Sequence, residues 1–324
     1  MCNVNQEKNV QCKSRKKFVS VVAYIHNDAH LLDEFFEKIL KNLINYFEKC
    51  ELILVNDYSQ DNSIELIKRF SENKKNLVIS IVNMSFFHGV EAAITAGVDL
   101  AIGDYVFEFE HINIDYPDEL IMNIYNQALT GYDIVSAVPN KKAYFTALGF
   151  YSLYNKYKIS MTNNKLCPET FRIVSRRAIN RINSMGRTIP YRKLMYINSG
   201  LPVYNFVYEP MTSKKYKLDK DSNKQRINLA MDSFMLFTTY MQRISILICL
   251  LFFGIAVGIG VYSIVSYLKE PEVRGYMIIL TGFMSMAISG IFLVLSIMIR
   301  YMSLILNTVF RKDKYTIESI MKLN

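Results

Sequence analysis

The sequence lacks the features of a secreted, disulfide-bonded protein. Its five cysteines show neither CxxC nor any other metal-binding spacing, and such an odd, scattered set favours reduced thiols in the cytosol. Residues 1–16 are polar and basic and have no apolar core, so they predict a disordered lead-in instead of a secretory signal peptide. A disulfide framework is therefore not expected to hold this fold together.

Charge is missing from two long runs near the C-terminus. Residues 244–268 and 276–299 contain no Asp, Glu, Lys or Arg, and each run is long enough to cross a bilayer as a helix. The short polar turn between them predicts a transmembrane hairpin, and residues 226–243 predict an amphipathic segment in the membrane interface. Lys and Arg gather on the outer flanks, so the positive-inside rule places both termini, including a tail at 300–324, in the cytosol. A hairpin buried inside a soluble protein is the alternative.

The composition agrees with a membrane location. Of the 324 residues, 51% are hydrophobic, which is high for a soluble enzyme, and the formal net charge is +9. Next to two apolar runs, a basic surface indicates attraction to anionic membrane lipids or to a phosphorylated substrate, and it argues against nucleic acid as a partner. We therefore expect a multi-pass protein of the cytoplasmic membrane. Because two-helix hairpins often associate, a homo-oligomer is among the expected partners, with no number of copies fixed.

Residues 17–225 alternate between strand-like apolar runs and segments with apolar residues at helical spacing. This alternation predicts βαβ units and a mostly parallel sheet, which is an α/β fold. Strands are expected at Phe18–Tyr24, Glu51–Val55, Leu77–Val82, Tyr105–Phe109, Asp133–Val138 and Val203–Tyr208, with a loop entering another strand at Cys167–Ser175. Helices are expected at Leu31–Phe47, Ser63–Phe70, Val90–Ala101, Lys141–Tyr157 and Arg176–Met185, with another beginning near Pro117.

Acidic and polar residues follow the expected strand Tyr105–Phe109. They include Glu110, His111 and Asp115. Ligands of open α/β sheets bind beyond the carboxyl ends of the strands, so carboxylates at this end predict a site for a metal or a phosphorylated ligand. A solvated turn between a strand and a helix is an equally weighted alternative.

Five segments carry a recognisable order of motifs: SVVAYIHND (20–28), ELILVNDYSQDNS (51–63), FFHGVEAAITAGVDLAIGDYV (86–106), EHINIDYPDEL (110–120) and ETFRIVSRR (169–177). This order resembles that of family 2 glycosyltransferases with the GT-A fold, a Rossmann-like fold of nucleotide-diphospho-sugar transferases. Within that family it is similar to the polyprenyl-phosphate glycosyltransferases, the group of dolichyl-phosphate mannose synthase. These have a GT-A domain, expected here at 17–225, followed by a two-helix transmembrane hairpin.

The resemblance implies a membrane-bound hexosyltransferase-type enzyme that acts in the synthesis of cell-envelope polysaccharide. Such an enzyme moves a sugar from a nucleotide-sugar donor to a polyprenyl (undecaprenyl-like) phosphate or a lipid-linked acceptor at the cytosolic membrane face. A divalent cation, Mg²⁺ or Mn²⁺, is expected to stabilise the charge of the donor diphosphate. The resemblance implies Glu110 and Arg172 as catalytic residues, Arg172 and Lys215 as contacts of the acceptor phosphate, and Glu110, with His111 or Asp115, as metal ligands. The residues implied to bind the nucleotide sugar are Asn27, Asp28, Asn56, Asp57, Asp61 and Glu110.

Four positions depart from the family's motifs. Asn56 and Ile112 each replace an Asp, and Ile112 stands at the second metal-binding position, where its apolar side chain cannot be a ligand. Val90 replaces a Lys, and Thr170 replaces an acceptor-side Asp. The alternative to an active enzyme is therefore a catalytically impaired GT-A relative that serves as a membrane-bound binding or assembly partner in glycan synthesis.

Overall fold

The computed structural model describes residues 17–72, 77–140, 151–152, 154–156, 164–185, 191–211, 227–228, 231, 240–269, 274–310 and 315–323. The chain divides into two compact units. The first consists of Met1–Tyr151, Thr162–Ile227 and Asp313–Asn324, and the second of Ser152–Met161 and Asn228–Lys312. The expected lead-in at 1–16, Lys215, and most of the segments 141–157 and 226–243 lie outside the described residues.

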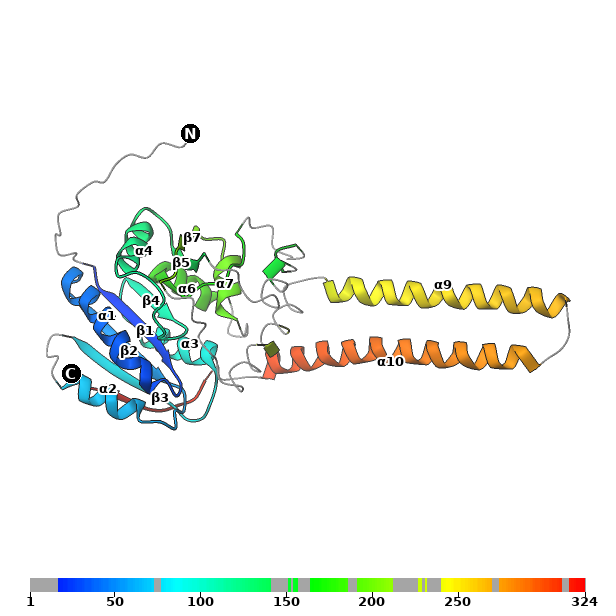
Figure 1. The fold of residues 1–324 in the computed structure, drawn as a ribbon, viewed down its shortest axis with the longest axis horizontal. Coiled ribbons are helices and arrows are strands. Elements are labelled where there is room, and N and C mark those ends of the chain that lie inside the picture. Colours follow the sequence, from blue (N-terminus) through cyan, green and yellow to red (C-terminus); the bar gives the residue numbers. More distant parts are fainter. Residues whose placement is uncertain are drawn as a thin grey trace, which may run out of the picture. The chain divides into compact units, whose positions relative to one another are not determined.

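The first unit is built on one eight-stranded sheet with the order β7-β5-β6-β4-β1-β2-β3-β8 (Figure 1). Its strands are β1 (Val19–Ile25), β2 (Cys50–Asn56), β3 (Val78–Met84), β4 (Tyr105–Phe109), β5 (Ile134–Pro139), β6 (Phe171–Ser175), β7 (Val203–Tyr208) and β8 (Ile317–Lys322). The central strands are apolar on both faces and are buried on both, as expected of strands covered by helices on two sides.

Helices cover both faces of this sheet. They are α1 (Leu32–Tyr46), α2 (Ser63–Ser71), α3 (Val90–Leu100), α4 (Leu120–Leu129), α6 (Arg176–Ser184) and α7 (Arg192–Asn198), with a short 3₁₀ helix, η1 (Ala29–Leu31), before α1. The apolar side chains of α1, α2 and α4 pack on one face, and those of α3, α6 and α7 pack on the other. The unit is therefore a three-layer α/β/α fold, and the predicted α/β class is confirmed.

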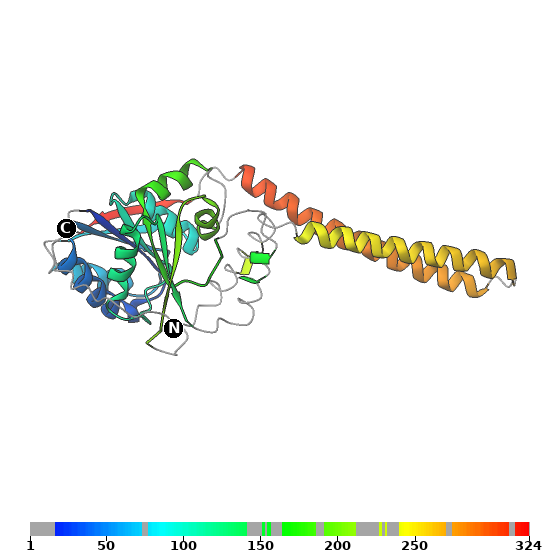
Figure 2. The same ribbon diagram turned by 90° about the horizontal axis from the view of Figure 1, so that it is seen from above.

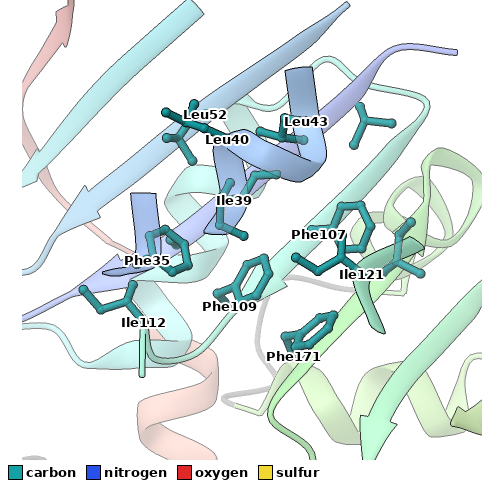
Figure 3. Close-up of a cluster of buried hydrophobic side chains, with 14 of the residues drawn as sticks. Phe35, Ile39, Leu40, Leu43, Leu52, Phe107, Phe109, Ile112, Ile121 and Phe171 are labelled. Carbon is teal, nitrogen blue, oxygen red and sulfur yellow. The ribbon is translucent and has the colours of Figure 1, made fainter. Parts of the chain in front are cut away.

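The face covered by α1 contains most of the aromatic core (Figure 3). Phe35 of α1 lies 5.5 Å from Phe109 of β4, ring centre to ring centre, and Phe171 of β6 lies 4.8 Å from the same ring. Ile112, three residues after β4 ends, belongs to this cluster and is only 1% exposed. The motif residue Ile112 is thus part of the hydrophobic core.

The sheet is mixed: four of its seven strand pairs are parallel, and the antiparallel placement of two strands was not predicted. β6 runs antiparallel between β4 and β5, and β8 runs antiparallel along β3. The parallel pairs are β1 with β2 and β4, β2 with β3, and β5 with β7. Strand β8 lies where the sequence predicts a tail, and it covers the backbone hydrogen-bonding groups that β3 would otherwise expose at the edge of the sheet.

The second unit contains two long helices, α9 (Tyr240–Lys269) and α10 (Arg274–Phe310), which lie side by side (Figures 1 and 2). Among the described residues, one stretch, Gly282–Met302 of α10, is long and apolar enough to cross a membrane, and Arg243–Ile259 of α9 is a shorter apolar stretch. A side chain at Gly290 of α10 would lie 2.6 Å from the ring of Phe252 of α9, so glycine is what permits the close approach of these helices.

Candidate active site

The carboxyl ends of β1 and β2 place Asp57 at the centre of a hydrogen-bonded loop cluster. Asp57 is fully buried, and its carboxylate accepts the backbone N–H of His88 at 2.8 Å, the backbone N–H of Gly89 at 2.7 Å and the hydroxyl of Tyr24 at 3.2 Å. Gly89 caps the start of α3 with a φ of 88°, a conformation that suits glycine. Asp57 therefore fixes the loop between β3 and α3 against the end of β2.

The other predicted nucleotide-binding residues on these strand ends lie in the same cluster. Asn27 has a left-handed φ of 57°, and its side-chain oxygen accepts the backbone N–H of Gln60 at 2.7 Å. Asp28 accepts the backbone N–H of His26 at 3.3 Å. Because β1 and β2 are neighbouring parallel strands, the structure brings Asn27 and Asp28 next to the loop that follows β2.

Asp61 and Asn56 tie this loop to its neighbours. Asp61 accepts the backbone N–H of Ala29 at 2.9 Å and the hydroxyl of Ser63 at 2.6 Å. Burial raises the pKa of Asp61, but these hydrogen bonds outweigh burial and lower it below the usual value. The side chain of Asn56 donates to Asn83 on β3 at 3.0 Å, and Asn83 donates to Ser319 on β8 at 3.0 Å. Asn56, at the position of a family Asp, is therefore part of a chain of uncharged hydrogen-bonding side chains that joins β2, β3 and β8.

A second cluster, made of charged side chains, lies on the face of the sheet that α3 and α7 cover. Arg172 of β6 stands directly opposite Glu108 of β4 in the antiparallel ladder, and its Nη1 donates to Glu108 at 3.1 Å. Its Nη2 donates to Glu110 and lies 2.7 Å from Glu169. The side chain of Arg172 is 2% exposed, against 0% for Glu108, 5% for Glu169 and 14% for Glu110. One guanidinium is thus surrounded by three carboxylates.

Helix α7 adds two further cations to this cluster. Arg192 lies 2.9 Å from Glu108, and Lys193 lies 3.2 Å from Glu169. The backbone N–H of Arg192 also donates to Glu91 on α3 at 2.9 Å. Burial and the nearby charge of Glu110 raise the pKa of Glu91 to about 7. We call these seven residues the ionic cluster: Glu91, Glu108, Glu110, Glu169, Arg172, Arg192 and Lys193.

Glu110 and Asp115, two of the predicted metal ligands after β4, contact other protein groups in the structure. The carboxylate of Glu110 is bonded to Arg172, and Ile112 is directed into the core because the chain leaves the strand after Phe109. Asp115 accepts the hydroxyl of Tyr208 at 2.8 Å, and His111 is half-buried beside Glu110 in the chain. Within the part of the chain that the structure describes, no three His, Cys, Asp or Glu side chains are grouped so that they could hold a metal ion. The donor set therefore does not fit a divalent cation.

A small recess opens beside the ionic cluster. It has a volume of about 280 Å³, open solvent included, and Arg172, Glu169 and Lys193 line it together with Ser136 of β5 and Asn205 of β7. The guanidinium of Arg172 borders this recess while both of its terminal nitrogens contact carboxylates. An anion that entered from this side would have to compete with those carboxylates for Arg172.

Sequence reasoning missed five of the seven members of the ionic cluster: Glu91, Glu108, Glu169, Arg192 and Lys193. A signal for one of them was present, because Glu108 is a charged residue in the middle of the apolar strand YVFEF, just as Arg172 interrupts FRIVS. A charge inside a buried strand requires a partner of opposite charge. The short helix α7, which carries Arg192 and Lys193, had no such signal and was not among the predicted helices.

The comparisons with known proteins agree with this geometry. The profile of the family described as "Glycosyl transferase family 2" matches residues 20–184. An uncharacterized glycosyltransferase of Synechocystis sp. is 30% identical over 187 residues, which cover 55% of this chain and 56% of that protein. An undecaprenyl-phosphate 4-deoxy-4-formamido-L-arabinose transferase of Pseudomonas fluorescens is 33% identical over 125 residues, covering 38% of this chain and 36% of that protein. The chain spans about half the length, or less, of the curated relatives it matches.

A solved structure supports the fold. Glucosyl-3-phosphoglycerate synthase from Mycobacterium tuberculosis, in complex with Mn²⁺ and UDP-glucose, superposes with a TM-score of 0.50 at 13% identity, covering 68% of this chain and 78% of that one. At this identity the likeness shows the GT-A fold alone. The family profile covers half of the chain and includes β1 to β6, which carry the Asp57 cluster and the Glu108–Arg172 pair; α7 lies beyond it. The chain belongs to glycosyl transferase family 2.

Proposed function

We propose that this chain transfers a sugar from a nucleotide-sugar donor to a polyprenyl phosphate of the undecaprenyl type, or to a lipid-linked acceptor, at the cytosolic face of the membrane. The observation that carries the proposal is the meeting of the motif residues at one edge of the sheet. Asn27 and Asp28 follow β1, Asp57 follows β2, and Glu110 follows β4. Relatives named as undecaprenyl-phosphate sugar transferases add support for this acceptor class.

In this proposal, the loops after β1 and β2 form the nucleoside side of the site. Asn27 and Tyr58 are exposed there, and both hold left-handed backbone conformations that fix the shape of the loops. Asp28, Asn56 and Asp61 keep the two loops together through hydrogen bonds to the backbone and to neighbouring side chains. Asp57 contributes by holding the His88–Gly89 segment, because both of its oxygens already accept backbone N–H groups.

Glu110 and Arg172 form the reacting end of the site. The acceptor phosphate is already anionic, so its attack on the sugar needs little help from a general base. Arg172 has the planar fork of donors that suits phosphate oxygens, and Glu110 orients that fork in the absence of ligand. Lys215, which lies outside the described residues, is a second proposed contact of the acceptor phosphate.

The helices α9 and α10 are proposed to cross the membrane as a hairpin with both termini in the cytosol. Support comes from the uncharged runs 244–268 and 276–299 and from the Lys and Arg residues that flank the pair. The segment 226–243 would then lie in the membrane interface. Association of hairpins would give a homo-oligomer.

A second candidate is a binding or assembly partner that retains the scaffold without activity. The observation that favours it is the altered metal motif: Ile112 lies in the core, and Glu110 is paired with Arg172. Such a protein would support the activity of a partner glycosyltransferase while having none of its own.

A donor screen on the full chain in detergent tests the proposed function. UDP-, GDP- and dTDP-sugars are offered with undecaprenyl phosphate, with and without Mg²⁺ or Mn²⁺. We expect one donor class to give a sugar-lipid product, and we expect the isosteric Glu110→Gln change to abolish it. The matched control is Glu65→Gln, the same change on the exposed surface of α2. The absence of both turnover and nucleotide-sugar binding across the panel would reject the enzyme and favour the scaffold.

A further inference from the structure

The three carboxylates around Arg172 meet one planar group from different directions. Glu108 contacts Nη1, whereas Glu110 and Glu169 contact Nη2. Among the described residues these oxygens are not grouped closely enough to hold a metal ion. Their arrangement fits the fork of a guanidinium, which is wider than a divalent cation and presents fixed N–H donors.

The position of this guanidinium is set by the sheet. Arg172 and Glu108 are direct partners in the ladder between β4 and β6, and a buried strand cannot shift by a residue without turning its side chains to the other face. Burial alone would lower the pKa of Arg172, but the three carboxylates raise it well above its usual value. The cluster therefore contains a permanent positive charge at a fixed place beside Glu110.

The second acidic ligand of the motif is absent because position 112 is Ile. β4 ends at Phe109, so the side chain at position 112 points to the face that α1 covers, where Ile112 packs against the aromatic core (Figure 3). A metal ion bound here would have Glu110 as its one carboxylate ligand from the motif. To bind Glu110, the ion would have to displace Arg172 from it. The displaced guanidinium would then be a buried charge with one partner fewer.

We propose that the guanidinium of Arg172 serves as the resident cation of this site, so that the chain binds the diphosphate of its nucleotide-sugar donor without a divalent metal. This inference rests on the proposed function, because it concerns the donor of that same reaction. It revises one part of it: Arg172 contacts the donor diphosphate, and Lys215 is left as the proposed contact of the acceptor phosphate. Glu110 is the most exposed of the three carboxylates, at 14% of its side-chain surface, so a phosphate oxygen replaces Glu110 on Nη2. Glu108 and Glu169, at 0% and 5%, stay in place and hold the guanidinium.

The test is a binding titration with UDP, GDP and dTDP as probes on the full chain in detergent. One arm contains excess EDTA and the other contains MnCl₂. We expect the dissociation constant of the preferred nucleotide to agree between the arms within about threefold. Binding that needs Mn²⁺, with a loss of about tenfold or more in EDTA, would overturn the inference while leaving the proposed function intact. If no nucleotide binds in either arm, the proposed function fails and this inference fails with it.

Two further measurements assign the role to Arg172. Arg172→Lys keeps the charge but loses the fork, and we expect at least a tenfold weaker nucleotide affinity in EDTA that Mn²⁺ does not restore. Arg177→Lys, the same change at a side chain that is 66% exposed, is the control and should bind like the wild type. Unchanged affinity of a folded Arg172→Lys protein would overturn the assignment.

The second measurement uses the wild-type chain alone and does not depend on the folding of a variant. The electron paramagnetic resonance signal of Mn²⁺ should remain that of the free ion when the protein is added. A bound signal that disappears in Glu110→Gln would overturn the inference.

Discussion

The Asp57 cluster at the carboxyl ends of the strands and the ionic cluster on the face that α3 and α7 cover are built from different interactions. Around Asp57, most of the donors are backbone N–H groups, and the remaining partners are hydroxyls and amides. In the ionic cluster, charged side chains from β4, β6, α3 and α7 mostly contact one another. The first cluster is positioned by the main chain, whereas the second depends on a balance of charges, so we expect it to be more sensitive to the loss of one charge.

Arg172→Met tests this dependence and should have the largest effect. It removes the cation that Glu108, Glu110 and Glu169 share, and it leaves buried carboxylates with too little positive charge. We expect a loss of about 3–5 kcal/mol in the free energy of unfolding, measured by denaturant titration of the full chain in detergent with circular dichroism. Arg181→Met, at an exposed arginine of α6, is the control. A loss below about 1 kcal/mol would mean that the ionic cluster is not held together by Arg172.

Asp57→Asn tests the cluster around Asp57 and should have the next largest effect on stability. The amide keeps the shape but turns an N–H₂ group toward either His88 or Gly89, whose backbone N–H groups need an acceptor. We expect a loss of about 2–3 kcal/mol by the same measurement, because a hydrogen bond to a charged group is lost and a buried donor is left without an acceptor.

Asp33→Asn, in the exposed first turn of α1, makes the matched change without these contacts and should cost less than about 1 kcal/mol. If Asp57→Asn proved as mild as this control, the loop between β3 and α3 would be held by something other than Asp57.

The sequence predicted the two clusters to different extents. The members of the Asp57 cluster were predicted from the resemblance of residues 20–28 and 51–63 to the family's motifs, and the parallel pairing of β1 with β2 brings them together. The pairing of Glu108 with Arg172 joins residues 64 positions apart and needs an antiparallel β6, which the expectation of a mostly parallel sheet did not contain. Strand β8 was missed for a related reason: its pairing with β3 joins segments more than 200 residues apart, and nothing local marks it.

Glu91→Gln tests the charge balance through pH and should have an intermediate effect. The pKa of Glu91 is about 7 in the folded chain, above its ordinary value of 4.5, so the folded state binds the extra proton between these values. The stability contributed by this group is fully present below about pH 4.5 and is lost as pH rises through 7. We expect the wild type to lose about 2–3 kcal/mol relative to Glu91→Gln between pH 5 and pH 8.

Denaturant titrations at these two pH values measure this difference. Glu65→Gln, at an exposed glutamate of α2, serves as the control and should parallel the wild type. Equal pH dependence of the wild type and Glu91→Gln would show that Glu91 is ionised throughout and that the ionic cluster tolerates its charge.

Thr316→Val should have the smallest effect on stability. It tests whether the cluster around Asp57 keeps its structure when one side-chain contact is lost. The Nδ1 of His88 lies 2.5 Å from the carbonyl oxygen of Phe86 and carries the proton, so Nε2 accepts the backbone N–H of Thr316 at 3.1 Å. The hydroxyl of Thr316 lies 3.2 Å from the same nitrogen. Valine removes only the hydroxyl, because the backbone bond remains. We expect a loss of about 0.5–1 kcal/mol in stability and a change in nucleotide affinity below about threefold.

Thr130→Val is the matched control for this change, since its hydroxyl donates to the carbonyl of Gln127 at an exposed helix end. A loss of more than about 2 kcal/mol in Thr316→Val alone would mean that the His88–Gly89 loop depends on a single side chain, as the ionic cluster is expected to depend on Arg172. The contrast between the two clusters would then be wrong. A small loss, with nucleotide affinity unchanged, means that backbone hydrogen bonds carry the contact of β8 with the His88–Gly89 loop. The residue that precedes β8 then contributes to this contact through its main chain, and the side chain of Thr316 is free to vary.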